Sequence, residues 1–246
     1  MTPEAPAALR ERFWELARAA RRPVAITGAG VSAESGVPTF RGEDGLWKRY
    51  RPEELATPGA FARNPELVWQ WYNWRRERIA RARPNPAHHW LARYERLKPG
   101  FVLVTQNVDG LHRLAGSRNV IEIHGNLWIV RCTKCRFEAE DRRVPMPILP
   151  RCPGCGGLVR PGVVWFGEPL PEEGLADAVE AVRRADLLLV LGTSAVVYPV
   201  AGLPDLAPDT PLVEVNPEPT PLSPRAALTV RMPVGAFLEP ILERLP

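Results

Sequence analysis

A short apolar run that leads directly into a glycine-bearing turn is the feature that most constrains this chain. Residues 23–26 have the composition of a buried strand, and Gly28 and Gly30 follow at once. Because glycine has no side chain, the backbone can turn tightly there, and a diphosphate can approach the N–H groups at the start of the next helix. The stretch therefore predicts a nucleotide-binding strand, turn and helix. Taken alone, the G-x-G-x-x-A pattern of residues 28–33 fits a plain turn between a strand and a helix equally well.

The segment after this turn indicates whether the chain is an ordinary dehydrogenase. Residues 35–47 contain several Gly and Pro residues, which predicts a mobile loop. An ordinary dehydrogenase would continue with a helix, a second strand and an acidic residue for the ribose. The loop therefore disfavours a plain dehydrogenase.

Strand-like runs that end in polar residues recur along the chain. The expected strands are residues 23–26, 101–105, 120–123, 187–191 and 212–215, and the expected helices are residues 3–21, 87–97, 175–185 and 237–245. Unbroken apolar strands are typical of a parallel sheet covered on both faces. The alternation therefore predicts an α/β fold with a doubly wound, Rossmann-like parallel sheet, in which ligands bind at the carboxyl ends of the strands.

All four cysteines lie in two C-x-x-C pairs, Cys132 with Cys135 and Cys152 with Cys155, which are separated by 16 residues. Four thiolates in a closed tetrahedral site are a common way to hold structural zinc. Two disulfides are the alternative, which a cytoplasmic location disfavours. A site with four thiolates has no open position for substrate, so the zinc is expected to stabilise a small module and to take no part in chemistry.

Length and charge limit the domain organisation and the partners. The 246 residues, 45% hydrophobic, are enough for one large domain, expected over residues 1–125 and 161–246, and a small zinc module over 126–160. A helical insert at about 42–83, with helix starts at Pro58 and Pro65, is expected to join the small lobe. The net charge of +4 is modest, and no apolar run reaches the roughly 18 residues that span a membrane. We expect a cytoplasmic monomer that binds neither membranes nor nucleic acid directly.

Histidine is scarce. His88 and His89 lie at an expected helix start and are predicted to be surface or packing residues. His112 follows the polar cluster of residues 106–109 and is a candidate for positioning it. His124 stands at a strand end just before the zinc module, so we expect it in the crevice between the two domains, where a structural role and a catalytic role both remain open.

Six motifs along the chain resemble those of one enzyme family. They are Gly28-Ala29-Gly30-x-Ser32-x-x-Ser35-Gly36-x-Pro38-x-Phe40-Arg41, Gln106-Asn107-x-Asp109, His124-Gly125, the four cysteines, Gly192-Thr193-Ser194 and Asn216-Pro217-Glu218. Their order and spacing are similar to those of the sirtuins, the NAD-dependent protein-lysine deacylases, over residues from about 10 to 245.

The resemblance implies a reaction and three catalytic residues. NAD would be a consumed co-substrate: the acyl-lysine carbonyl oxygen attacks the nicotinamide ribose at C1′, and nicotinamide leaves. A neutral imidazole at His124 would act as general base on the ribose hydroxyls. The products would be free lysine, nicotinamide and 2′-O-acyl-ADP-ribose. Asn107 and Asp109 match the residues that hold the nicotinamide carboxamide and the ribose.

The resemblance also assigns the cofactor contacts. Phe40 and Arg41 match a loop whose ring would exclude water from the reacting face, and an adenine contact is expected near Val234. The full expected set is Gly28, Ala29, Gly30, Ser32, Ala33, Glu34, Thr39, Phe40, Arg41, Trp47, Gln106, Asn107, Asp109, Gly192, Thr193, Ser194, Asn216, Pro217, Glu218 and Val234.

Two further segments resemble the edges between which sirtuins receive an acyl-lysine protein or peptide as an added strand. The expected contacts are Val164, Trp165, Phe166, Gly167, Glu168, Val196 and Tyr198. Such strand addition uses main-chain hydrogen bonds and predicts weak sequence preference.

Tyr72-Asn73-Trp74-Arg75 matches the Tyr-x-x-Arg of sirtuins that remove negatively charged acyl groups. A guanidinium can bind a distal carboxylate through two hydrogen bonds, and a phenol can add one. Ala56 is small, as a longer acyl chain requires, whereas Trp165 stands where many relatives carry Phe. The resemblance therefore predicts removal of succinyl or malonyl groups besides acetyl. Alternatively, Arg75 is one of five arginines on a solvated helix face (Arg75, Arg76, Arg78, Arg81 and Arg83).

Two other functions use the same pocket. One is mono-ADP-ribosyl transfer to a protein side chain, and the other is NAD binding without turnover. The combination of His124, Asn107 and Asp109 disfavours a loss of catalysis.

Overall fold

The computed structural model describes residues 6–39 and 52–245. Phe40, Arg41 and Trp47, which the resemblance assigns to the cofactor loop, lie outside the described residues. No helix within 6–39 and 52–245 combines the length and the apolar composition needed to cross a membrane.

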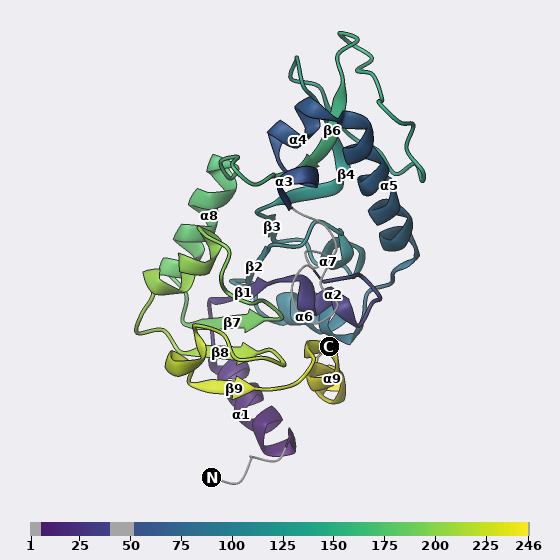
Figure 1. Ribbon diagram of the computed structural model, residues 1–246. Coiled ribbons are helices and arrows are strands. Elements are labelled where there is room, and N and C mark those ends of the chain that lie inside the picture. The colour runs from purple at the N-terminus through teal and green to yellow at the C-terminus, as the bar shows by residue number, and fades with distance from the viewer. Residues whose placement is uncertain (1–5, 40–51, 246) are drawn as a thin grey trace.

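A parallel sheet of six strands forms the centre of the larger lobe (Figure 1), and the predicted doubly wound fold is confirmed. Its order is β3-β2-β1-β7-β8-β9, and every neighbouring pair is parallel. The strands are β1 (Pro23–Thr27), β2 (Val102–Thr105), β3 (Val120–Glu122), β7 (Leu187–Leu191), β8 (Leu212–Val215) and β9 (Leu228–Val230). The chain reverses its direction of winding between β1 and β7, and this is the point where such sheets bind ligands.

Helices cover both faces of this sheet because its strands are apolar on both faces. Ala25 packs toward α1 (Pro6–Ala19), α6 (Pro86–Leu97) and α9 (Val234–Leu238). Its neighbours Val24 and Ile26 pack toward α8 (Glu172–Arg183) and the 3₁₀ helix η2 (Val200–Leu206). Successive side chains of a strand point to opposite faces, so each strand contributes to two cores. Figure 1 accordingly shows α8 on one side of the sheet and α6 and α9 on the other.

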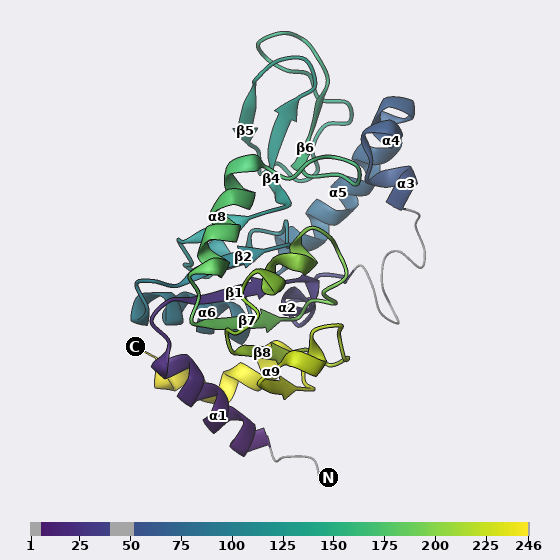
Figure 2. The same ribbon diagram turned by 90° about the vertical axis from the view of Figure 1, so that its left-hand side faces the viewer.

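The smaller lobe lies at one end of the molecule in both views (Figure 2). An antiparallel sheet of order β5-β4-β6 is formed by β4 (Gly125–Cys132), β5 (Glu138–Glu140) and β6 (Val159–Val163). It shares one hydrophobic core with α3 (Pro52–Leu55), α4 (Pro58–Arg63) and α5 (Pro65–Arg81). The helical insert and the cysteine-containing segment are therefore packed together.

The helix starts at Pro58 and Pro65 are confirmed, and each has a side-chain cap. Thr57 Oγ1 accepts a 3.0 Å hydrogen bond from the N–H of Ala60, and Asn64 Oδ1 accepts one of 3.0 Å from the N–H of Leu67. Proline at the first helical position removes an N–H that would have no partner there.

Two parts of the sequence-based description needed correction. The helix expected at 237–245 is only α9, which ends at Leu238, followed by the 3₁₀ helix η4 (Glu239–Arg244). Pro240 lacks the N–H that would continue the α-helix. Strand β9 was not predicted, because three residues with a central threonine give too short a pattern. The remaining short helices are α2 (Ala29–Ala33), α7 (Leu111–Leu114) and η3 (Ser223–Arg225).

Candidate functional site

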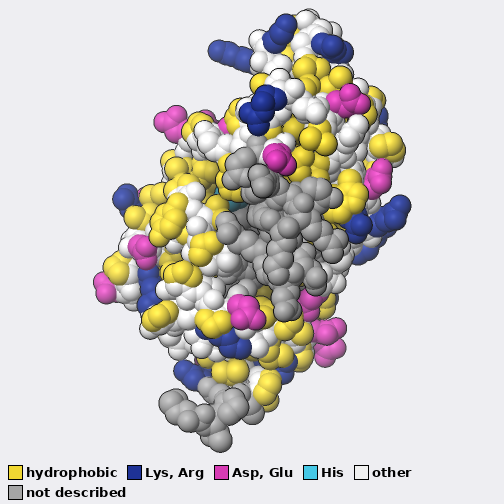
Figure 3. Space-filling model, viewed as in Figure 1, with side chains coloured by type: hydrophobic (Ala, Val, Ile, Leu, Met, Phe, Trp, Pro, Cys, Tyr) yellow, Lys and Arg dark blue, Asp and Glu magenta, His cyan; other side chains and the backbone are white. Residues whose placement is uncertain are grey.

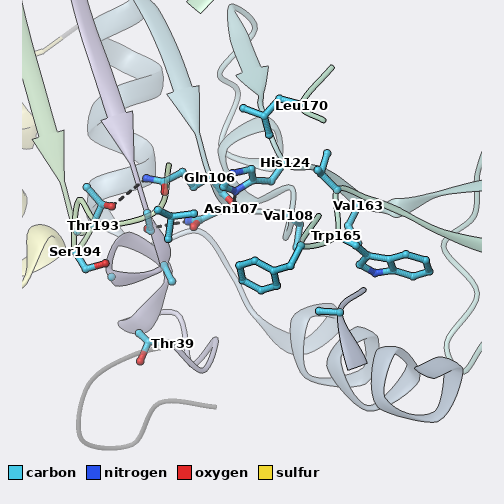
Figure 4. Close-up of a pocket in the computed structure, with 18 of the residues that line it drawn as sticks. Thr39, Gln106, Asn107, Val108, His124, Val163, Trp165, Leu170, Thr193 and Ser194 are labelled. Carbon is cyan, nitrogen blue, oxygen red and sulfur yellow. Dashed lines mark hydrogen bonds between the residues drawn. The ribbon is translucent and has the colours of Figure 1, made fainter. Parts of the chain in front are cut away.

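A cavity of about 1140 Å³ lies at the carboxyl ends of the central strands and extends to the smaller lobe. Glycine-loop residues line it at one end, and residues 163–170, at and after the end of β6, line it at the other. Figure 4 shows Thr193 and Ser194 on one side and Val163 and Trp165 on the other, with Gln106, Asn107 and His124 between them. The cavity is large enough for a dinucleotide-sized ligand together with part of a second ligand.

The glycine loop packs directly against the loop that follows β7. A Cβ atom on Gly28 would lie 2.7 Å from Thr193 Cβ, and one on Gly30 would lie 2.8 Å from the carbonyl oxygen of Gly192. The N–H of Gly30 donates a 2.8 Å hydrogen bond to that same oxygen. The close contact between the two loops therefore requires glycine at both positions. This requirement comes in addition to the access to the backbone that a ligand would need.

Gln106 spans the point where the sheet reverses its winding. Its Nε2 donates a 3.0 Å hydrogen bond to Thr193 Oγ1, which joins the ends of β2 and β7 across β1 (Figure 4). This contact closes the base of the cavity.

Asn107, Ser32 and Asp109 form a buried hydrogen-bonded group behind the glycine loop. Asn107 Nδ2 donates to the carbonyl oxygen of Gly28 at 3.0 Å and to Ser32 Oγ at 3.1 Å. Ser32 Oγ donates to Asp109 Oδ2 at 2.8 Å, and the N–H of Leu111 donates to Asp109 Oδ1 at 2.8 Å. Burial raises the pKa of Asp109, and these two donors oppose the rise. Asn107 lines the cavity, whereas Ser32 and Asp109 support it from behind.

His88 extends this group, a role that the sequence did not reveal. Its Nδ1 accepts a hydrogen bond from the N–H of Asn85 at 3.2 Å, so its Nε2 carries the proton and donates to Ser32 Oγ at 3.3 Å. The hydroxyl of Ser32 must then donate to Asp109. Burial lowers the pKa of His88 to about 2, so the ring is neutral. His89 is exposed, as expected of a surface residue.

His112 is connected to Asn107 through two threonine hydroxyls, in line with its expected positioning role. Its Nε2 lies 3.1 Å from Thr27 Oγ1, which donates to Thr105 Oγ1 at 2.8 Å. Thr105 Oγ1 also accepts a 3.1 Å hydrogen bond from the N–H of Asn107. Burial lowers the pKa of His112 to about 3.

His124 lies in the cavity wall, in the turn between β3 and β4. Its Nδ1 is 3.2 Å from the carbonyl oxygen of Gln106, an acceptor, so Nδ1 carries the ring proton and Nε2 keeps its lone pair. Burial lowers the pKa of His124, which keeps the imidazole neutral. The next residue, Gly125, has φ +76, and a Cβ there would lie 2.2 Å from the carbonyl oxygen of Gly162. Only glycine therefore fits this turn, which sets the position of His124.

Arg75 and Tyr72 lie in the other end of the cavity, so the solvated-face alternative is wrong for Arg75. Arg75 is 7% exposed and Tyr72 is 2% exposed, and both line the cavity with Ala56 and Trp165. The next residue, Arg76, is fully buried under the smaller lobe. Of the five arginines, Arg78, Arg81 and Arg83 are exposed.

Most of the expected cofactor and substrate residues in the described ranges line this one cavity. They are Gly28, Ala29, Gly30, Ala33, Glu34, Thr39, Ala56, Tyr72, Arg75, Gln106, Asn107, His124, Val164, Trp165, Phe166, Gly167, Glu168, Gly192, Thr193, Ser194, Tyr198, Asn216, Pro217 and Glu218. Four do not line it: Ser32, Asp109, Val196 and Val234. Val234 is 1% exposed, and the neighbouring Pro233 lines the cavity in its place.

Two acidic residues of this set have their carboxylates bound within the protein. Glu34 accepts hydrogen bonds from the N–H groups of Gly235 at 2.6 Å and Ala236 at 3.0 Å, and so caps the start of α9. Glu168 binds the guanidinium of Arg160, with Oε2 2.9 Å from Nη2. Arg160 and the adjacent N–H of Trp165 oppose the burial of Glu168 and lower its pKa overall. Both acids therefore hold the walls of the cavity.

A buried acid that the sequence motifs do not include holds the loop that carries Asn216 and Glu218. Glu214, fully buried on β8, accepts hydrogen bonds from Thr220 and Ser223. It also pairs with Arg231 at 2.5 Å. The sequence contained one indication of this role: Glu214 is an acidic residue inside an otherwise apolar strand, and a buried carboxylate requires partners.

The four cysteines form a compact cluster suited to one zinc ion. Their Sγ atoms all lie within 4.8 Å of one another, with 3.4 Å between Cys132 and Cys155 and 3.6 Å between Cys135 and Cys152. Four sulfurs at about 2.3 Å from zinc would be about 3.8 Å apart, whereas a disulfide bond is about 2.05 Å long. The cysteines are free thiols, so the two-disulfide alternative is wrong. The predicted zinc ligands are thus brought together, away from the residues that line the cavity.

Comparisons with known proteins give the family. The Sir2 family pattern matches residues 28–199. The "NAD-dependent protein deacylase 1" of Caldanaerobacter subterraneus subsp. tengcongensis is 58% identical over 217 residues, which are 87% of this chain and 90% of that protein.

Two solved structures are similar over nearly the whole chain. One, described as a Sir2 homolog–NAD complex, has a TM-score of 0.89 and 51% identity and covers 95% of this chain and 93% of its own. The other, described as "Sir2-p53 peptide-NAD+", has a TM-score of 0.85 and 34% identity and covers 95% and 97%. The glycine loop, the cavity, the cysteine cluster and these similarities together establish that the chain belongs to the Sir2 family, the sirtuins.

Proposed function

We propose that this protein is an NAD-dependent protein-lysine deacylase. The observation that carries the proposal is the arrangement of His124 and Asn107 in one cavity with the glycine loop at one end and Tyr72 and Arg75 at the other. Of the relatives described above, one is named a deacylase, one is described as a complex with NAD, and one as a complex with NAD and a p53 peptide. NAD would supply the electrophilic ribose carbon and the nicotinamide leaving group.

The residues of the chain have separate tasks in this proposal. Asn107, whose Nδ2 donates to Gly28 and Ser32, would have its Oδ1 available to accept from the nicotinamide end of the cofactor. His124, with its proton on Nδ1, offers the Nε2 lone pair as general base toward a ribose hydroxyl. Its lowered pKa keeps that lone pair available near neutral pH. Asp109 acts through Ser32 and the backbone, because it lies behind the cavity wall.

The proposed peptide site uses the two edges at residues 163–168 and 196–198. Phe166, Val196 and Tyr198 are exposed by 45%, 42% and 74%, and Figure 3 shows hydrophobic side chains on both sides of the undescribed segment. An extended acyl-lysine peptide could bind between these edges through its backbone. Binding through the backbone would give the weak sequence preference expected above.

We further propose that the acyl pocket accepts an acidic acyl group such as succinyl or malonyl. Arg75 is buried, and burial lowers its pKa, yet a guanidinium remains charged at neutral pH. A buried cation that lines a cavity favours an anionic ligand there. Ala56 leaves space at the cavity wall for a longer chain.

The remaining proposals concern the context of the enzyme. We propose a cytoplasmic monomer that binds no nucleic acid. Its larger lobe comprises residues 1–125 and 161–246, except for the helical insert at about 42–83, which joins the zinc module of residues 126–160 in the smaller lobe. Four cysteines that form no disulfide bonds suit a reducing compartment, and the net charge is only +4.

The first test is a comparison of steady-state rates on one peptide that carries either acetyl-lysine or succinyl-lysine, with NAD. Nicotinamide release and acyl-ADP-ribose would be followed by mass. Deacylation predicts both products in equal amounts. Labelled protein without acyl-ADP-ribose would instead support ADP-ribosyl transfer, and NAD binding without either product would support a non-catalytic role. A higher kcat/KM for the succinyl peptide would support the acidic acyl pocket.

A further inference from the structure

Trp165 is hydrogen-bonded to the phenol that lies in the acyl pocket. Its indole Nε1 donates to Tyr72 Oη at 2.9 Å, and the two residues are 3% and 2% exposed. They are separated by 93 positions in sequence, since Tyr72 lies on α5 and Trp165 follows β6. A phenylalanine at position 165 would fill a similar space but would have no N–H to donate.

This hydrogen bond determines what the phenol can offer to a ligand. A phenolic oxygen has one proton to donate and lone pairs to accept. The indole N–H occupies a lone pair of Tyr72 and cannot itself accept a proton. Among the residues that the structure describes, no acceptor for the phenolic proton lies within hydrogen-bond distance of Tyr72. The phenol is therefore left as a donor in the cavity wall, where a carboxylate oxygen of the ligand can accept.

The indole is held rigidly, so the donor direction is fixed. The guanidinium carbon of Arg160 lies 3.4 Å from the centroid of the indole ring, and Phe61 packs against the ring with centroids 5.3 Å apart. Glu168 completes the arrangement: it pairs with Arg160 and accepts a 2.8 Å hydrogen bond from the backbone N–H of Trp165.

Arg75 lies beside the phenol, one turn after Trp71 and Tyr72 on the same side of α5. Its guanidinium carbon is 5.8 Å from the ring centroid of Tyr72 and 5.1 Å from that of Trp71. A cation and a preset O–H donor thus line the same part of the cavity. A ligand with one distal carboxylate can bind both groups, whereas the methyl group of an acetyl chain can bind neither.

We infer that Trp165 is a specificity-determining residue, which sets Tyr72 as a hydrogen-bond donor and so favours acyl-lysines with a distal carboxylate over acetyl-lysine. It acts through Tyr72 and is a positioning residue in this respect. The inference rests on the proposed removal of acidic acyl groups, and it adds a residue of this chain that the Tyr-x-x-Arg pattern does not contain.

The test is a double-mutant cycle on the ratio of kcat/KM for succinyl-lysine to kcat/KM for acetyl-lysine in one peptide, with NAD. We expect Trp165→Phe to lower this ratio about fivefold, the size of one neutral hydrogen bond, and Tyr72→Phe to lower it at least as much. In the Tyr72→Phe background, Trp165→Phe should lower it no further. Trp74→Phe is the matched control, because Trp74 lies on the same helix as Tyr72 but does not line the cavity. This substitution should leave the ratio unchanged.

The ratio does not depend on the fraction of folded enzyme, since both rates come from the same preparation. An unchanged ratio in Trp165→Phe, or equal losses in the presence and absence of the Tyr72 hydroxyl, would overturn the role of Trp165 and leave the proposed function intact. A wild-type enzyme that removes acetyl but no succinyl or malonyl groups would overturn the acidic pocket and this inference together.

Discussion

The guanidinium Nη1 of Arg76 donates a 2.7 Å hydrogen bond to the carbonyl oxygen of Leu127, 51 residues further along the chain. Its Nη2 donates to the carbonyl oxygens of Asp141 and Arg143, and the group stacks on Trp128 at 4.8 Å. One buried arginine of α5 therefore binds three backbone carbonyl groups in two segments of the smaller lobe.

Replacement of Arg76 by Met should destabilise the protein by about 3–5 kcal/mol, because the substitution leaves buried carbonyl groups without donors. Urea unfolding at pH 7 would measure the loss. Arg81→Met, at an exposed position of the same helix, should change the free energy of unfolding by less than about 0.5 kcal/mol. Similar stabilities of the two variants would contradict this role of Arg76.

His124→Ala should abolish acyl-ADP-ribose formation while NAD still binds, because the variant lacks the general base but keeps the glycine loop. A loss of at least about a hundredfold in kcat is expected for a general base. Mass detection of the product and calorimetric titration of NAD would measure the two properties. Turnover at the wild-type rate would exclude His124 as the base.

Arg75→Met should lower the ratio of kcat/KM for succinyl-lysine to kcat/KM for acetyl-lysine by about tenfold or more, since a charge-assisted hydrogen bond would be lost. Both rates would be measured on one peptide. Arg78→Met, at an exposed position of the same helix, is the matched control and should keep the wild-type ratio. Equal losses on both substrates would mean that Arg75 does not bind the acyl carboxylate.

His88 and His112 should make the protein less stable as the pH falls from 7 to 5. Their folded-state pKa values are about 2 and 3, because burial disfavours the charged ring, whereas an unfolded histidine has a pKa of about 6.5. Below pH 6.5 the unfolded chain binds protons that the folded chain does not, so acid favours unfolding. Each histidine should contribute about 2 kcal/mol to the difference between pH 7 and pH 5.

Urea unfolding of His112→Asn at both pH values would test this dependence. The variant should show a pH difference about 2 kcal/mol smaller than that of the wild type. His89→Gln, at an exposed position, should show the wild-type difference. A pH dependence unaffected by His112→Asn would contradict a neutral buried ring.

Cys152→Ser should remove zinc and destabilise the smaller lobe, because Cys152 is 3% exposed and belongs to the core that the lobe shares with α3–α5. We expect a loss of at least about 4 kcal/mol, which corresponds to a decrease in Tm of about 8–16 °C. Metal analysis of the purified protein should give one zinc per chain for the wild type and less for the variant. A wild-type protein that contains no zinc and melts at the temperature of the variant would contradict a structural metal.

Local patterns were sufficient for five of the six strands of the parallel sheet and for the starts of α4 and α5. The strands at 187–191 and 212–215 have the predicted bounds, and proline after a capping residue identified the starts of α4 and α5. The C-terminal helix was less predictable, because an apolar period alone does not distinguish an α-helix from a short α-helix followed by a 3₁₀ turn.

Local information was insufficient for the buried charges. Arg75 and Arg76 are neighbours in sequence and have equal helix propensity, yet one lines the cavity and the other lies beneath the smaller lobe. The two arginines differ because α5 has different neighbours on each side. Segments about 50 to 90 residues away in sequence supply these neighbours.

The sequence by itself determined the parallel sheet, the zinc ligands and the family, because apolar runs, C-x-x-C pairs and ordered motifs depend on residue types at short spacing. Only the tertiary structure decided that His88 supports Ser32, that Glu34 caps α9 and that Trp165 donates to Tyr72. These contacts join residues 56 to 201 positions apart, and in each of them a buried group (His88, the N–H of Gly235 or Tyr72) meets a partner that only the fold brings near it.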